Sequence, residues 1–221
     1  MLYKLLLNKY LGGFNRKLYH FFGLGDPFLQ FYKSYSQHGQ DMFFLFFFNK
    51  KNGVFVDIGA RDGKLNSNTY FLEKYFGWTG VCVEPHPTLF KQLKNVRKSI
   101  NINCAVSNQA KVQDSHPFVV YNSGPLGNSG LLIDSYANSD KYSKYSHEVI
   151  DVSIQTLTDI LTQSNIVDVD VLDIDVEGAE QLVLESLDFT AFNIKMISVE
   201  NVTPEIIQLL AQFDYKCLTQ L

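Results

Sequence analysis

Two carboxylates and two glycines stand at spacings that suit the binding of a nucleoside cofactor. Asp57 and Gly59 follow a short apolar run, and Glu84 closes a second one. Gly63 and a helical pattern lie between the two runs, so the predicted order is strand, glycine turn, helix, strand. A carboxylate at the end of the second strand of such a unit can accept hydrogen bonds from both hydroxyls of a ribose. The segment therefore predicts a nucleoside pocket.

Asp57 discriminates between two classes of cofactor. A dinucleotide fold uses a G-x-G-x-x-G turn to seat a pyrophosphate on a helix N-terminus, and a carboxylate two residues before the first glycine would repel that group. S-adenosylmethionine instead carries an ammonium and a sulfonium, so Asp57 beside the ammonium and Glu84 beside the ribose would match its charges. The residues favour S-adenosylmethionine over a nicotinamide cofactor. The simpler interpretation, that both acids only end strands and cap helices, remains open.

A second acidic cluster follows the apolar, β-branched run at residues 167–174. Asp173 and Asp175 share one face of this predicted strand, and Glu177 lies beyond its end. Ligands of open α/β sheets bind at the carboxyl ends of the strands, where the strand order reverses. Asp175 is therefore expected to face the reacting group and to accept a proton from the acceptor, with Glu177 or His38 as alternative bases.

Oxygen ligands for a divalent cation follow the next predicted strand, at residues 194–199. Glu200 and Asn201 close this strand and would lie near Asp175, and such oxygens suit Mg²⁺. The metal-free arrangement, in which a carboxylate alone acts as the base, is preferred slightly.

Four short motifs, taken together, resemble one known family. They are SQHGQD at residues 36–41, VDIGA at residues 56–60, GWTG at residues 77–80 and IDVEGAE at residues 174–180. Their order and spacing resemble the FkbM-type methyltransferases from about residue 34 to about residue 200. The resemblance implies a class I, S-adenosylmethionine-dependent methyltransferase with a Rossmann-like, doubly wound sheet in three αβα layers. It also implies methylation of an oxygen of a sugar or polyketide.

Position and resemblance together give a set of cofactor contacts. Gln37 and Gln40, before a helix expected from about residue 37, line the site by resemblance. At the end of the strand predicted over residues 100–106, Ala105 and Val106 are expected by position to pack against the adenine ring. Ser107 or Asn103 is expected to hydrogen-bond its edge. The complete predicted cofactor set is Gln37, Gln40, Asp57, Gly59, Ala60, Gly63, Ser67, Asn68, Glu84, Pro85, Ala105, Ser107 and Asp175.

Two departures from the family pattern keep other functions open. Arg61 stands where many methyltransferases have a glycine, and no final antiparallel strand is recognisable after residue 218. The sheet edge is then either truncated or completed by a partner subunit, as in a homodimer. A non-catalytic binding or scaffold module is the main alternative function, and a nicotinamide oxidoreductase is a weaker one.

Composition limits the compartment and the partners. The 221 residues, 46% hydrophobic and 19% charged, suit one globular domain. The net charge of −4 argues against nucleic acid as a partner and leaves a small-molecule or glycan acceptor. Three widely spaced cysteines indicate free thiols in a reducing, cytoplasmic compartment, with no zinc site.

The chain is predicted to consist of an N-terminal extension at residues 1–33 and a methyltransferase domain at residues 34–221. The basic residues 1–22 have roughly helical spacing and suit either a helix docked on the domain or peripheral contact with a membrane. The apolar run at residues 42–48 is too short to span a bilayer. Residues 121–148, rich in Gly, Ser, Asn and Tyr, are expected to cover the substrate.

The sequence also predicts three helices and their boundaries. Helices are predicted over residues 66–77, capped by Ser67 or Asn68, and over residues 88–98. Arg97 is assigned to the solvated face of the second of these helices. A third helix is expected over residues 154–161, with Thr156 or Ser153 as its cap.

Overall fold

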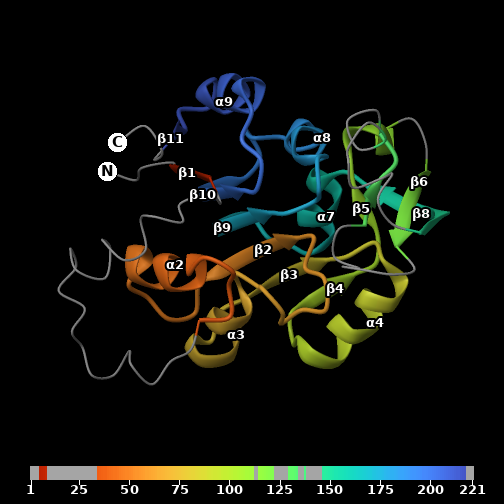
Figure 1. Ribbon diagram of the computed structural model, residues 1–221. Coiled ribbons are helices and arrows are strands. Elements are labelled where there is room, and N and C mark those ends of the chain that lie inside the picture. Colours follow the sequence, from red (N-terminus) through yellow and green to blue (C-terminus); the bar gives the residue numbers. More distant parts are fainter. Residues whose placement is uncertain are drawn as a thin grey trace.

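The computed structural model describes residues 5–8, 34–111, 114–121, 129–133, 137 and 146–217. Its centre is a seven-stranded sheet in the order β11–β1–β10–β9–β2–β3–β4, in which every pairing is parallel (Figure 1). The strands are β1 (Leu5–Asn8), β2 (Val54–Ile58), β3 (Thr79–Val83), β4 (Ile100–Ile102), β9 (Asp168–Ile174), β10 (Asn193–Val199) and β11 (Lys216–Cys217).

Helices cover both faces of this sheet (Figure 1). One face carries α2 (Gln40–Phe48), α3 (Tyr70–Phe76) and α4 (Pro87–Val96), and the other carries α7 (Leu157–Gln163), α8 (Glu180–Glu185) and α9 (Pro204–Ala211). The first interface is largely aromatic, with Phe44, Phe71 and Trp78 buried. The second is aliphatic, with Leu161, Val183 and Ile197 fully buried. The predicted three-layer α/β fold of the class I methyltransferase type is confirmed.

The two central strands place acidic residues side by side. β2 pairs with β9 so that Asp57 lies opposite Asp173, which confirms the predicted adjacency of these strands. Both strands are β-branched and buried, as is usual for the middle of a parallel sheet. Their acidic residues stand at the carboxyl ends, the expected location of a ligand site.

A second, four-stranded sheet was not foreseen from the sequence. It contains β5 (Ala105–Val106), β6 (Ser115–Tyr121), β7 (Gly130–Leu131) and β8 (His147–Gln155) in the order β5–β8–β6–β7. The strand predicted over residues 100–106 is therefore split between the two sheets. The helix expected to begin at Ile154 begins at Leu157 instead, since Ile154 belongs to β8. The predicted cap Thr156 is confirmed, because its Oγ1 accepts the N–H of Asp159 at 3.0 Å. A short 3₁₀ turn, η2 (Asn108–Lys111), joins β5 to the rest of this sheet.

The N-terminal segment contributes a strand in place of the expected helix. β1 inserts between β10 and β11 and pairs in parallel with both. A short run of leucines fits either period, and pairing with two neighbouring strands decides in favour of the strand. Among the described strands, β11 therefore lies at the edge of the sheet, with β1 as its neighbour. Residues 1–4 and 9–33 lie outside the described residues, as does most of residues 121–148, so the membrane-contact and substrate-covering predictions rest there.

Two predicted helices begin later than expected. α2 begins at Gln40 because Gly39, with a φ of 83°, precedes it in the left-handed conformation. α3 begins at Tyr70, whose N–H donates to Ser67 Oγ at 3.0 Å. None of the described helices is long and apolar enough to cross a membrane.

Candidate active site

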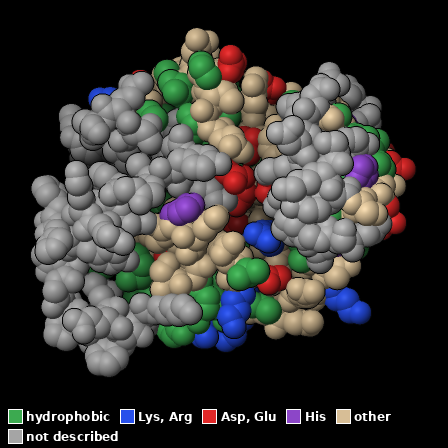
Figure 2. Space-filling model, in the orientation of Figure 1, with side chains coloured by type: hydrophobic (Ala, Val, Ile, Leu, Met, Phe, Trp, Pro, Cys, Tyr) green, Lys and Arg blue, Asp and Glu red, His purple; other side chains and the backbone are tan. Residues whose placement is uncertain are grey.

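A cavity of about 40 Å³ opens where β2, β3 and β9 end against the second sheet. The cavity is smaller than the ~300–1,000 Å³ usual for small-molecule sites. Its apolar wall is formed by Val83, Leu89, Ala105, Val106, Phe118 and Leu131, and its polar lining includes Gly59, Arg61, Glu84 and Asp175. Figure 2 shows acidic side chains gathered in a hollow near the middle of this face of the molecule. The cavity therefore combines a flat apolar wall with acidic groups.

Glu84 is held rigidly at the end of β3. Its Oε2 accepts the N–H of Arg61 at 2.8 Å, and its Oε1 accepts the N–H of His86 at 2.8 Å. Burial raises the pKa of this carboxyl to about 7, although both backbone donors act in the opposite direction. Each carboxylate oxygen keeps a further lone pair for a ligand hydroxyl. This position suits the predicted contact with a ribose.

The glycine turn follows β2 and approaches β9 closely. Gly59 has a φ of 89°, and a Cβ there would lie 1.9 Å from the carbonyl oxygen of Asp175. Only glycine fits such an approach. Arg61 adopts a φ of 54°, a left-handed conformation that costs a residue with a side chain about 1 kcal/mol. The backbone at Arg61 therefore keeps the left-handed conformation that a glycine would adopt easily, although a side chain is present.

Asp175 lines the cavity directly beyond β9. Its backbone N–H donates to the carbonyl of Ile58 at 2.9 Å. One carboxylate oxygen each from Asp175, Glu177 and Glu200 lies within 4.8 Å of the others. Asn201 instead donates from Nδ2 to Glu180 Oε1 at 3.1 Å. Among the described residues, these three acids are the group that could hold a cation.

Asp57 is not among the residues that line the cavity. Its Oδ2 accepts the Oγ1–H of Thr69 at 2.5 Å and lies 3.6 Å from Arg97 Nη1. Burial raises the pKa of Asp57, and the charge of Arg97 opposes that rise. The assignment of Arg97 to a solvated helix face is wrong, since its side chain is buried. Leu89 and Leu93 precede it at intervals of four residues, and this spacing was the signal for a buried position.

Asp173 is buried beside Asp57 on the same side of the sheet. Its Oδ2 accepts a hydrogen bond from Asn68 Nδ2 at 2.8 Å. Burial raises its pKa to about 7, with a further contribution from the charge of Asp57. Asp173 therefore lies in an acidic environment adjoining Asp175, although it does not line the cavity.

The structure divides the predicted site residues into two groups. Gly59, Glu84, Pro85, Ala105 and Asp175 line the cavity. The following predicted residues are not among those that line it: Gln37, His38, Gln40, Asp57, Ala60, Gly63, Ser67, Asn68, Ser107 and Glu177.

The residues outside the lining have other contacts. Ser107 is fully buried and accepts the N–H of Gln109 at 3.2 Å. Gln37 is exposed, and the N–H of His38 donates to Gln40 Oε1 at 3.0 Å.

Sequence reasoning missed the wall that the second sheet provides. Phe118 and Leu131 come from β6 and β7, and Ser129 directly precedes β7. The apolar run at residues 118–121 was the available signal, but the pairing that brings it to the cavity is long-range.

The comparisons with known proteins bear on this geometry. A family model described as the methyltransferase FkbM domain matches residues 57–217. The chain belongs to the FkbM methyltransferase family. The matched region contains every residue that lines the cavity. No curated protein and no solved structure matches the chain.

The family assignment confirms the predicted resemblance and makes this chain a methyltransferase domain. Methyltransferases of this kind generally use S-adenosylmethionine, so the cavity is the place to test for that cofactor. The acceptor and the position methylated are not specified by membership of the FkbM family.

Proposed function

We propose that this FkbM protein is an S-adenosylmethionine-dependent O-methyltransferase whose acceptor is a sugar hydroxyl of a glycan or glycosylated metabolite. The observation that carries this proposal is that Glu84 and Asp175 line one cavity from opposite sides of the Gly59 turn. A hydrogen-bond acceptor for a ribose and a proton acceptor for the acceptor hydroxyl thus share one site.

The donor set of the cavity fits the proposed cofactor. Val83, Leu89 and Val106 offer an apolar wall for an adenine ring. Glu84 offers carboxylate oxygens for the ribose hydroxyls, and the close approach at Gly59 leaves backbone next to the ligand. When bound, S-adenosylmethionine supplies an electrophilic methyl group on a sulfonium. The negative charges of the site suit that cation.

Asp175 is the group best placed to accept a proton. Methyl transfer is an in-line displacement, so the protein mainly aligns the nucleophilic hydroxyl and accepts its proton. Asp175 lies at the cavity wall with Glu177 and Glu200 close by. In the proposed mechanism, the carboxylate of Asp175 would take the hydroxyl proton as the oxygen–carbon bond forms. The carbon–sulfur bond would break at the same time, and S-adenosylhomocysteine would leave as a neutral thioether. Phe118 and Leu131, on the opposite side, exclude water from the apolar part of the cavity.

The proposed role of Asp175 does not require a metal ion. Asp175, Glu177 and Glu200 would be the ligands if a divalent cation took part, since their oxygens are close enough for a shared ion. A cation there would polarise the hydroxyl in place of a free carboxylate base. Chelation distinguishes these two arrangements.

The test of the proposed function is transfer of a labelled methyl group to defined acceptors. Purified protein is incubated with methyl-labelled S-adenosylmethionine and a panel of glycosides, each paired with its fully O-methylated form as the control. The proposal predicts label in glycosides with free hydroxyls and none in the blocked controls. Label that appears in amine or thiol acceptors instead would contradict O-methylation. Binding of NAD but not of S-adenosylhomocysteine would contradict the choice of cofactor.

A further inference from the structure

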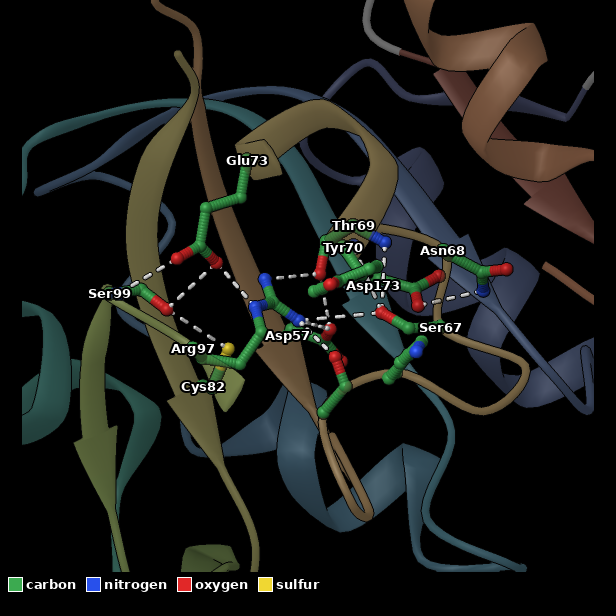
Figure 3. A network of polar contacts seen from close by, with 12 residues as sticks. Asp57, Ser67, Asn68, Thr69, Tyr70, Glu73, Cys82, Arg97, Ser99 and Asp173 are labelled. Carbon is green, nitrogen blue, oxygen red and sulfur yellow. Dashed lines mark hydrogen bonds and ion pairs between the residues drawn. The ribbon is translucent and has the colours of Figure 1, made fainter. Parts of the chain in front are cut away.

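Arg97 is a buried cation at the C-terminal end of α4. It lies behind the glycine turn that follows β2, at residues 59–69. Only 4% of this residue is exposed. Figure 3 shows its guanidinium between Asp57, Glu73 and the segment that carries Ser67 and Thr69. The position is costly for a charge unless the charge is paired and hydrogen-bonded. Its partners show what the charge does there.

One side of the guanidinium is anchored to the scaffold. Arg97 Nε donates to Glu73 Oε2, and the other oxygen of Glu73 accepts the N–H groups of Lys98 at 2.6 Å and Ser99 at 3.1 Å. Glu73 thereby connects α3 to the chain that enters β4. The ring of Phe55 lies 5.0 Å from the guanidinium carbon. These contacts fix the position of Arg97 relative to the sheet.

The other side of the guanidinium contacts the turn itself. Nη2 donates to Thr69 Oγ1 at 2.8 Å, and Nη1 donates to the carbonyl of Gly63 at 3.3 Å and to Ser67 Oγ at 3.4 Å. Nη1 also lies 3.6 Å from Asp57 Oδ2. A rigid fork with five donors can join several acceptors in this way, whereas an ammonium cannot reproduce the geometry.

The turn rests directly on the side chain of Arg97. A Cβ at Gly63 would lie 2.8 Å from Arg97 Cγ and 2.7 Å from Leu93 Cδ1. On its cavity side, the same turn is held by Val83 and Glu84, which accept the N–H groups of Ala60 at 3.0 Å and Arg61 at 2.8 Å. The turn is thus fixed from the front by β3 and from behind by Arg97.

We propose that Arg97 is a positioning residue for the cofactor, holding residues 59–69 from behind so that Gly59 and Arg61 keep their place at the cavity. The inference rests on the proposed function, since it concerns binding at that same cavity. Arg97 does not line the cavity and acts through the turn. The separate roles of its two sides allow a matched control.

The test compares Arg97→Lys with Glu73→Gln. The first keeps a positive charge near Asp57 but loses the fork that joins Gly63, Ser67 and Thr69. The second weakens the anchor on the side away from the turn, so it tests for a purely structural effect. We expect Arg97→Lys to weaken binding of S-adenosylhomocysteine about tenfold or more in calorimetric titration, roughly the loss of one charged hydrogen bond. We expect Glu73→Gln to change that affinity less than threefold while lowering the urea midpoint.

Hydrogen exchange of the ligand-free protein gives a second measurement. Arg97→Lys is expected to speed exchange of the amides in residues 61–68 and to leave those of β9 unchanged. If wild-type protein fails to bind S-adenosylhomocysteine, the proposed function is wrong, while the exchange experiment still decides whether Arg97 orders the turn.

Two results would overturn the inference. One is binding of S-adenosylhomocysteine by Arg97→Lys with the wild-type affinity. The other is unchanged exchange in residues 61–68. If Arg97→Lys does not fold, Thr69→Val removes the shortest contact with the turn and keeps the buried cation. Because Thr69 Oγ1 also donates to Asp57 in β2, exchange then decides. Faster exchange in residues 61–68 with β2 and β9 unchanged would support the inference, and unchanged exchange in residues 61–68 would overturn it.

Discussion

The buried acids at the two ends of β9 have different partners, and their pKa values are shifted in opposite directions. At the amino end, Asp170 is bonded to Lys195 at 2.7 Å, to Lys50 at 2.6 Å and to the N–H of Val54 at 2.8 Å. Burial would raise its pKa, but the two lysines lower it below its ordinary value. At the carboxyl end, Asp173 is bonded to the neutral Asn68 and Ser198, and burial raises its pKa to about 7.

The difference is between a carboxylate that is paired with lysines and carboxylates whose hydrogen-bond donors are neutral. Asp170 joins β9 to β2 and β10, and its charge is neutralised by lysines. Asp173 and Glu84 are equally buried but have neutral hydrogen-bond donors, which leaves their charge to be balanced in another way. Acids with strongly perturbed pKa values near a cavity are candidates for a functional site; Glu84 lines the cavity, and Asp173 lies next to Asp175, which lines it. A cationic cofactor at the carboxyl edge would balance these charges.

The largest expected effect of a substitution at the carboxyl end of β9 is on turnover. Asp175→Asn keeps the shape of the side chain but removes the proton acceptor, so kcat is expected to fall by roughly 10²–10⁴-fold. Affinity for S-adenosylhomocysteine should change little. The matched control is Asp170→Asn at the opposite end of the same strand, which should keep wild-type kcat per folded molecule. Equal kcat in wild type and Asp175→Asn would remove Asp175 from the mechanism.

A second expected effect is a loss of stability when Asp170, at the amino end of β9, is replaced. Asp170→Asn leaves Lys50 and Lys195 without their carboxylate, and loss of one partner of a fully buried pair costs ~3–5 kcal/mol. The lysine side chains remain 35% and 27% exposed, so solvent reduces this cost. We expect a loss of about 2 kcal/mol in the free energy of unfolding, measured by urea denaturation. An unchanged urea midpoint would show that the pair has no structural role.

A third effect is the pH dependence of stability. The pKa of Asp173 is raised from 3.8 to about 7, so the folded protein keeps a proton that the unfolded chain has already released. Stability of the ligand-free protein should therefore fall as pH rises from about 4 to 7. Glu84, raised from 4.5 to about 7, acts in the same direction.

Two variants distinguish the contributions of the two ends of β9 to the pH dependence of stability. Asp173→Asn should make the fall in stability shallower. Asp170→Asn should leave the slope above pH 5 unchanged, because the lowered pKa of Asp170 places its titration below that range. Urea midpoints measured at several pH values test both. Identical slopes for wild type and Asp173→Asn would contradict the assigned environment of Asp173.

The smallest expected effect is that of metal removal. If the carboxylate of Asp175 is the base, EDTA should leave the rate of methyl transfer within experimental error of the untreated rate. Loss of activity restored by Mg²⁺ would instead assign Asp175, Glu177 and Glu200 as ligands.

Local sequence patterns predicted the glycine turn after β2 and the acidic residues at the ends of the neighbouring strands. Glu84 and Asp175 follow short apolar strands, and parallel strands bring such ends to one edge. Gly59 was identifiable because a tight turn next to a ligand requires glycine. These features depend on residues within a few positions of each other, so the sequence is sufficient to place them.

Long-range pairing explains what the sequence did not predict. β1 depends on contacts with β10 and β11, about 200 residues away in the chain. Phe118 and Leu131 reach the cavity only through the second sheet. Arg97 follows Leu89 and Leu93 at intervals of four residues, which was a local signal for burial, but its partner Asp57 lies 40 residues away in the chain and could not be predicted from that spacing.

The central claim is that this cavity binds S-adenosylmethionine through Glu84. The direct test is calorimetric titration of wild type and Glu84→Gln with S-adenosylhomocysteine, after both proteins are shown to have similar urea midpoints. We predict binding by wild type and a loss of affinity of about 10–100-fold in Glu84→Gln, because a charged hydrogen-bond acceptor is removed. Equal affinity of the two proteins, or no binding by wild type, would contradict the claim.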